Sequence, residues 1–320
     1  MAAEESHQQT QLGDLPEACL AYAIALTSPR DACRCAAVSP SFRAAADSDH
    51  VWHRFIPEDH RAVLLKSSPT AAETRKKDAY LGLCDGGVPV DGDGECRMWL
   101  DKASGAKCYA LSARRLSLPW DDGEFSWRWT RHTLSRFAEV AELVDCTCLD
   151  IYGRLPAVSL TPATAYAAYL VYGTAEGHRG LSYPDQETAV AVGGRVLERH
   201  RVCLRPDDAE TRKFRGAGLI AESSSGAGDG SEEPRRPRRR GDGWWEMEMG
   251  RLRTASSAGE LVEEDEVVAS FEVLGWYPKR GLIVEAIEFR PTGGESCCVK
   301  GRGRISITSS NHASFRAKLV

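Results

Sequence analysis

The chain has 320 residues, of which 27% are charged and 42% are apolar, a composition typical of one or two globular domains rather than of a disordered or fibrous chain. No run approaches the roughly 18 consecutive apolar residues of a membrane span, and the first residues resemble no secretory signal, so we expect a chain outside the secretory route without a membrane partner. The 41 Lys and Arg residues against 46 Asp and Glu residues give a net charge of −5, which predicts no nucleic-acid partner, and we expect the eleven cysteines to be reduced thiols.

Three or four short helices are predicted between residues 15 and 55. Pro16 stands at a first-turn position with an acidic residue behind it, which indicates a helix start. The next start is stronger, because Ser28 can cap the helix, Pro29 suits its first position and Asp31 can return a hydrogen bond to the cap. Two further starts are indicated at Ser39-Pro40 and Ser48-Asp49. A unit this small buries little surface, so its apolar groups are available for another chain or for packing against the rest of this one.

Residues 61–105 lose periodicity and gain Ser, Pro, Lys, Gly and Asp, which indicates a connecting segment. Beyond Cys108 the sequence alternates between apolar and polar residues and predicts strands of an antiparallel sheet or sandwich, at 142–152, 165–172, 266–274 and 281–289. The run 223–243 is of low complexity, and the tail after Pro291 has no sustained pattern.

No catalytic constellation is found in the sequence. It has no GxSxG, P-loop or HExxH motif, and the glycine run 226–230 lacks the strand and helix that frame a phosphate loop. The pairs Cys33/Cys35 and Cys146/Cys148 lack the spacing of a structural zinc site, and we interpret them as buried, inert thiols. We therefore expect no catalytic residue, no metal and no cofactor.

The cluster of tryptophans between residues 120 and 129 is unusual in a chain with 8% aromatic residues. Indole faces stack on the C–H face of a sugar ring while nearby carboxylates bind its hydroxyls, and Trp120 and Trp127 surround an acidic turn that contains a glycine. The alternative is that both indoles fill the core of the sandwich.

The segment 15–57 resembles an F-box, through Leu15-Pro16 and the stretches TSPRDACR, VSPSFR and SDHVWHRF. In that family the helical unit docks on a Skp-type adaptor and, through it, on the cullin of an SCF ubiquitin ligase. The resemblance implies apolar adaptor contacts, which we assign to Leu15, Pro16, Ile24, Val38 and Trp52.

The remainder, from Trp99 to Pro291, is similar to the phloem lectin (Nictaba-like) domain, in the order seen in plant F-box proteins. The stretches FAEVAELVDCTCLDIYGRL, YAAYLVYG, GDGWWEMEMGRL and GLIVEAIEFRP carry the match. The resemblance implies a β-sandwich that binds N-acetylglucosamine oligomers or N-glycan cores. The whole chain is then of the α+β class, a helical F-box unit followed by an antiparallel β-sandwich.

The lectin resemblance also implies four sugar-binding residues, which are Trp120, Trp127, Glu266 and Glu272. The family carboxylates are seven residues apart and these are six apart, so Asp265 competes with Glu266 for one role. Pro119 replaces the usual polar residue before the first tryptophan and removes a backbone donor, which affects the expected sugar preference.

The predicted organisation is a disordered N-terminus at 1–11, an F-box at 12–58, a connecting segment at 59–104, the lectin-like sandwich at 105–291 with an insertion at about 221–243, and an irregular tail at 292–320. We expect a non-catalytic recognition subunit of the nucleus and cytoplasm with a glycan or glycoprotein ligand and an unidentified degradation target. The alternatives are a lectin without a ligase role and a ligase subunit whose sandwich binds protein. The arginine run 234–240 is either a nuclear import patch or a solvated loop.

Overall fold

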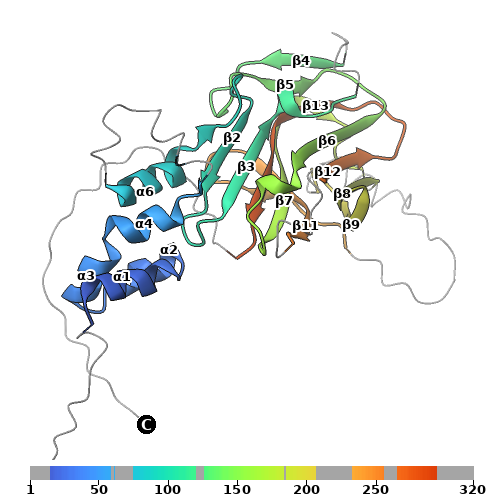
Figure 1. Cartoon of the computed structure of the whole chain (residues 1–320). Helices are drawn as coiled ribbons and strands as arrows, with labels where there is room; N and C mark the ends of the chain where they lie inside the picture. Colours follow the sequence, from blue (N-terminus) through green and yellow to red (C-terminus); the bar gives the residue numbers. More distant parts are fainter. Residues whose placement is uncertain are drawn as a thin grey trace, which may run out of the picture.

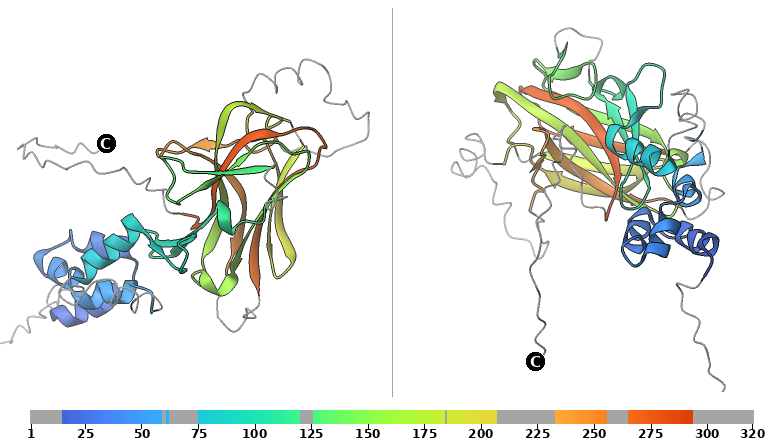
Figure 2. Two further views of the ribbon diagram at one scale, coloured as in Figure 1. Left: turned by 90° about the horizontal axis from the view of Figure 1, so that it is seen from above. Right: turned by 90° about the vertical axis from the view of Figure 1, so that its left-hand side faces the viewer.

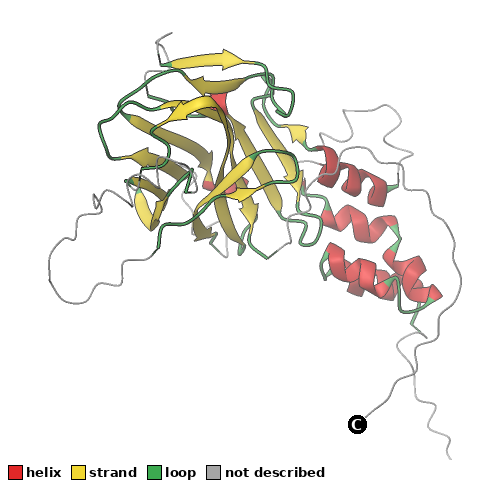
Figure 3. Cartoon of the chain, turned by 180° about the vertical axis from the view of Figure 1, so that it is seen from behind, coloured by secondary structure: helices red, strands yellow, loops and turns green. Residues whose placement is uncertain are grey.

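The computed structural model describes residues 15–58, 61, 75–119, 126–183, 185–206, 233–255 and 265–293. A group of short helices stands at one end of a larger domain made of two β-sheets (Figure 1; Figure 3). The predicted N-terminal segment 1–11 and most of the tail 292–320 lie outside the described residues.

The helical unit begins with α1 (Glu17–Ala25), α2 (Pro29–Cys35), α3 (Pro40–Ala46) and α4 (Asp49–Phe55). The predicted capping at α2 is confirmed, because Ser28 Oγ accepts from the Asp31 amide at 3.2 Å and donates to Asp31 Oδ2 at 2.7 Å. Ser39 caps α3 in the same way, with its Oγ 3.3 Å from the Phe42 amide. In the described part of the chain no helix is long and apolar enough to cross a membrane.

The predicted connecting segment instead contains α6 (Lys76–Gly86), β1 (Val88–Pro89) and β2 (Cys96–Leu100). The side chain of Tyr80 on α6 is fully buried, its ring centroid lies 5.2 Å from that of Trp52 on α4, and its hydroxyl donates to the Asp101 carbonyl at 3.1 Å. The Gly- and Asp-rich residues that indicated a connection make the turns between these short elements. As a result the helical unit and the β domain share one continuous hydrophobic core. Figure 2 shows the helix of residues 76–86, in teal, between the blue helices and the β domain.

The larger sheet runs in the order β1-β2-β3-β13-β7-β11-β10, and β5 joins it beside β13 with β4 at its other side. Its further strands are β3 (Lys107–Ser112), β4 (Trp127–Thr130), β5 (Val140–Leu143), β7 (Ala165–Arg179), β10 (Arg238–Arg239), β11 (Trp245–Arg253) and β13 (Arg280–Pro291). Every pairing between its named strands is antiparallel, as predicted.

The smaller sheet runs in the order β6-β12-β8-β9 and packs face to face on the larger one. Its strands are β6 (Leu149–Pro156), β8 (Gln186–Val192), β9 (Arg195–Val202) and β12 (Glu266–Val273). The sheets approach closely at Gly153 on β6, where a Cβ atom would lie 3.0 Å from Ile287 Cδ1 on β13. Short 3₁₀ turns at Ala113–Arg115 and Ala157–Ser159 connect strands at the edge.

The single strand predicted at 142–152 is two strands in different sheets. The chain leaves β5 in the larger sheet and crosses to β6 in the smaller one, and its crossing is fixed by backbone hydrogen bonds between Cys146 and Lys279 of 3.0 and 2.7 Å. Alternation alone indicates a strand but cannot tell where it changes sheets.

The predicted low-complexity insertion at about 221–243 is ordered in its described part, residues 233–243. Arg238 and Arg239 form β10 and pair with β11. Arg240 binds Glu288 at 3.0 Å, and Arg235 binds Glu248 at 3.1 Å. The run therefore forms part of an edge strand rather than a loop, and buried Glu288 binds Arg240. Arg236, Arg238 and Arg239 nevertheless stay exposed, as the alternative of a solvated segment predicts.

Candidate functional site

The helical unit exposes a group of apolar side chains. Its exposed fractions are 41% for Leu15, 63% for Tyr22, 66% for Leu26 and 69% for Val38. Tyr22 and Leu26 are four residues apart, which places them on one face of α1 and its C-terminal end, opposite the buried face. Neither Tyr22 nor Leu26 was predicted as an adaptor contact, although this spacing is readable from the sequence.

The five residues predicted for adaptor contacts fall into two groups. Leu15, Pro16 and Val38 are exposed. Ile24 and Trp52 are 3% and 1% exposed and lie in the core, so a direct contact from them is not compatible with this fold. The Trp52 indole donates to the Ala46 carbonyl at 2.7 Å, which satisfies its N–H inside the core. These two residues hold the helices together instead.

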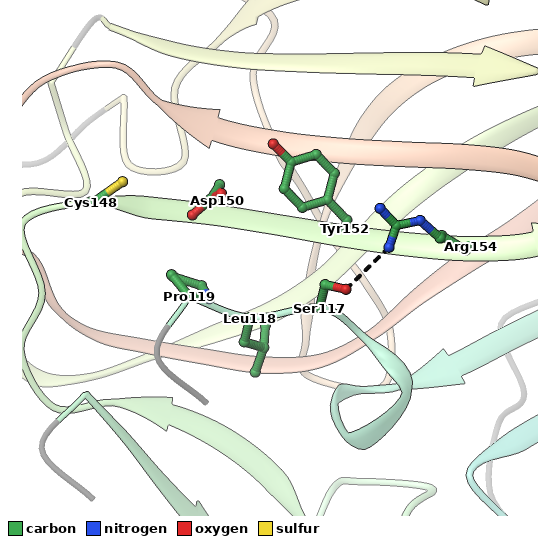
Figure 4. Close-up of a pocket in the computed structure, with 7 residues that line it drawn as sticks. All are labelled: Ser117, Leu118, Pro119, Cys148, Asp150, Tyr152 and Arg154. Carbon is green, nitrogen blue, oxygen red and sulfur yellow. Dashed lines mark hydrogen bonds between the residues drawn. The ribbon is translucent and has the colours of Figure 1, made fainter. Parts of the chain in front are cut away.

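A pocket of about 450 Å³ opens at the edge of the smaller sheet (Figure 4). The outward side chains of β6 form one wall, and the segment 117–119 forms the other. That segment extends the sheet, because Ser117 and Tyr152 exchange backbone hydrogen bonds of 2.8 and 3.0 Å. The lining residues are Ser117, Leu118, Pro119, Cys148, Asp150, Tyr152 and Arg154.

Trp127 does not line this pocket. Its side chain is 3% exposed, and its indole Nε1 donates to the Pro119 carbonyl at 2.8 Å. The expectation that Trp127 stacks on a sugar is therefore wrong for this conformation, because no face of the ring is open. Trp127 instead holds the wall of the pocket. Trp120, which follows Pro119 directly, lies outside the described residues.

Carboxylates and a phenol gather beside the pocket. Asp150 on β6 stands opposite Glu272 on β12, and the Tyr152 hydroxyl donates to Glu272 Oε1 at 3.2 Å. Burial, followed by the nearby Glu272 charge, raises the pKa of Asp150. The same two causes raise the pKa of Tyr152 to about 12. The site is therefore rich in hydrogen-bond acceptors, the groups that bind sugar hydroxyls.

The predicted pair Glu266 and Glu272 does not meet. Both side chains leave the same face of β12, but six residues of extended strand separate them by about 20 Å. Glu266 contacts Arg154 at 4.0 Å, and Asp265 packs against the turn at Gly193. Neither glutamate lines the pocket itself, but each contacts a lining residue, Glu272 through Tyr152 and Glu266 through Arg154.

Asp150 and Tyr152 join the site without having been predicted. The alternation of the stretch DIYGR places both on one strand face, but only the partner strands show which face is outward.

Of the four thiols that were expected to be buried, only Cys146 is. Burial raises the pKa of Cys146 to about 12, whereas Cys33 is exposed on the helical unit. Within the described ranges no group of three or more His, Cys, Asp or Glu side chains is arranged to hold a metal ion.

Comparisons with known proteins identify both parts of the chain. Residues 12–57 match the F-box-like family model, and residues 106–291 match the phloem protein 2 model. The putative F-box protein PP2-B8 of Arabidopsis thaliana is 35% identical over 297 residues, 91% of each chain. The F-box protein PP2-B10 of the same plant is 33% identical over 285 residues, 89% of this chain and 95% of that one.

Among solved structures, a family 35 carbohydrate binding module from Clostridium thermocellum aligns with 57% of this chain and 96% of its own, at 10% identity and a TM-score of 0.28. A score that low supports no functional conclusion. The sequence relatives and the two family matches show the family: the chain belongs to the F-box proteins that carry a phloem protein 2 domain.

Proposed function

We propose that this protein is a substrate-recognition subunit of an SCF-type cullin-RING ubiquitin ligase. The observation that carries the proposal is the exposed apolar group Leu15, Tyr22, Leu26 and Val38 on an F-box helical unit. Four exposed large apolar side chains on so small a unit favour a protein partner, and a Skp-type adaptor bound to cullin is the partner that an F-box implies.

The second half of the proposal concerns the ligand. Asp150, Tyr152 and Glu272 offer acceptors for sugar hydroxyls at the edge of an open pocket. In sequence, Trp120 directly follows Pro119, which lines this pocket. We assign N-acetylglucosamine oligomers or N-glycans to this pocket. The protein itself breaks no bond, and the ligase gains rate because the bound target is held near the ubiquitin-loaded enzyme. We place this activity in the nucleus and cytoplasm.

The adaptor half is tested by co-purification of the full chain with a Skp-type adaptor under reducing conditions. Val38→Asp puts a charge in the exposed apolar group and is expected to abolish the complex. Val196→Asp is the matched control, because Val196 is 50% exposed on β9 of the sandwich. Failure of the wild-type chain to bind any Skp-type adaptor refutes the assignment.

The ligand half is tested by a glycan-array screen of the full chain beside Glu272→Gln. Selective binding to N-acetylglucosamine or N-glycan structures that the variant loses supports a glycan-reading subunit. Glycan binding without adaptor binding would make the protein a lectin with no ligase role.

A second candidate keeps the ligase and gives the sandwich a protein ligand. The burial of Trp127 favours it, because one of the two expected sugar-stacking rings is occupied in the core. A folded chain that binds no glycan but captures a protein through the pocket face would establish this alternative.

A further inference from the structure

Trp276 is the most exposed large apolar side chain in the described residues, with 81% of its surface open to solvent. It lies in the segment 274–279 between β12 and β13, two residues after Leu274, which is 54% exposed. Single exposed apolar side chains are common on protein surfaces, but an indole that the backbone holds outward offers a flat face for stacking. Neither the F-box nor the pocket explains this ring.

The backbone on both sides of Trp276 is fixed by a buried lysine. Lys279 is 0% exposed, and its Nζ donates to the carbonyls of Gly275 at 2.6 Å and Tyr277 at 2.9 Å. A third hydrogen bond, of 2.9 Å, reaches the carbonyl of Thr147 on the crossing segment between β5 and β6. Burying an ammonium group is costly, and these three acceptors offset the cost. The lysine thereby holds the loop in one shape with the indole outward.

A second set of contacts supports the loop from below. The Tyr277 ring stacks on Tyr183 with 4.0 Å between centroids, and its hydroxyl donates to Asp185 Oδ1 at 2.6 Å. At Gly275 a Cβ atom would lie 2.0 Å from Asp185 Oδ2, so only glycine fits here. The Asp185 carboxylate therefore lies directly against the backbone that precedes Trp276.

The loop is continuous with the pocket. Thr147, which Lys279 holds, is followed by Cys148 of the pocket wall. Glu272, which binds the Tyr152 hydroxyl, precedes Trp276 by four residues, so their Cα atoms are at most about 14 Å apart. An oligosaccharide of a few rings is long enough to span this distance.

We propose that Trp276, on the loop held by Lys279, is an outer sugar subsite that stacks on one ring of a glycan whose inner ring occupies the pocket. This proposal rests on the proposed glycan-binding function. A flat, amphipathic indole suits the C–H face of a sugar. Because the loop is already ordered, little entropy is lost on binding.

The test is calorimetric titration of the full chain with N-acetylglucosamine and its β-1,4-linked oligomers of increasing length. Wild-type affinity is expected to rise with oligomer length. Trp276→Ala should lower affinity for the longest oligomer about tenfold, the loss of a contact worth about 1.4 kcal/mol, and leave the monosaccharide unaffected. Trp276→Phe keeps an aromatic face and should retain most of the affinity. Leu134→Ala, at a 50% exposed residue between β4 and β5, is the control and should change nothing.

Equal affinities of wild type and Trp276→Ala for every oligomer would overturn the subsite alone, provided that Glu272→Gln still abolishes binding. A wild-type chain that binds no oligomer would overturn the glycan-binding function and the subsite together. Because Trp276 is exposed, the alanine variant should keep the wild-type thermal midpoint, so reduced affinity cannot be attributed to unfolding.

Discussion

Removing the charge of Glu288 is expected to destabilise the β domain strongly. This carboxylate on β13 is 1% exposed and forms ion pairs with Arg136 at 2.5 Å, Arg240 at 3.0 Å and Arg290 at 3.4 Å. Burial acts to raise the pKa of Glu288, but the charges of the three arginines outweigh it and hold this pKa well below its usual value. The side chain is therefore ionised in the folded protein.

Glu288→Gln keeps the size of the side chain but leaves three guanidinium groups with one fewer counterion. Breaking a buried ion pair from one side costs about 3 to 5 kcal/mol. We expect the lower end, about 3 kcal/mol at pH 7, because Arg136 is 33% exposed and Glu246 and Glu285 still neutralise part of the cluster. The measurement is the free energy of unfolding in urea, followed by tryptophan fluorescence.

The difference between wild type and Glu288→Gln should depend on pH. The folded pKa of Glu288 lies below its unfolded value of about 4.3, so its charge stabilises the fold above that pH. This contribution is lost progressively as the pH falls below about 4.3 toward the folded pKa, and the variant should then approach the wild type. Glu233→Gln, in an exposed pair with Arg236, is the control and should cost under about 0.5 kcal/mol. A loss under about 1 kcal/mol at pH 7, or a difference that persists in acid, would refute the reasoning.

Three further predictions concern the helical unit and the pocket. Ser28→Ala removes the α2 cap and should cost about 1 kcal/mol in a thermal melt, and an unchanged midpoint would contradict the capping role. Trp127→Phe leaves the Pro119 carbonyl without its donor and should cost about 1 to 3 kcal/mol and weaken glycan affinity, whereas unchanged affinity by calorimetry would show that Trp127 does not position the pocket wall. Glycan affinity should fall as the pH drops through the raised pKa of Asp150, because its protonated carboxyl is a poorer acceptor. Asp150→Asn should flatten that pH profile, and an identical profile in the variant would contradict the assignment.

Local chemistry in the sequence predicts the helix starts well. The Ser28-Pro29 cap needs only neighbours within one turn, and the structure confirms it. Burial was harder to predict, because the resemblance that assigned Ile24 to the adaptor contacts could not show that this side chain lies in the hydrophobic core. The helix α6 was missed because Gly82 and Gly86 hide the pattern of Tyr80, Leu83 and Cys84 that packs on Trp52.

The site was only partly predictable for a similar reason. Glu272 was named in advance, but its neighbours Asp150 and Tyr152 come from a strand more than a hundred residues earlier in the chain. Only the register between β6 and β12 brings them together. Trp127 was expected at the sugar site but is buried, because alternation within a four-residue strand does not tell which face is buried. The buried Glu288 that binds Arg240 likewise lies on a distant strand.

Ubiquitin transfer in a reconstituted SCF reaction tests the central claim most directly. The acceptor is a glycoprotein with accessible N-glycans, and the same protein after enzymatic deglycosylation is its control. The proposed function predicts ubiquitin chains on the glycosylated form alone, lost with Val38→Asp, which breaks adaptor binding, and with Glu272→Gln, which breaks glycan binding. Equal transfer to both forms of the acceptor, or transfer that survives Val38→Asp, would contradict it.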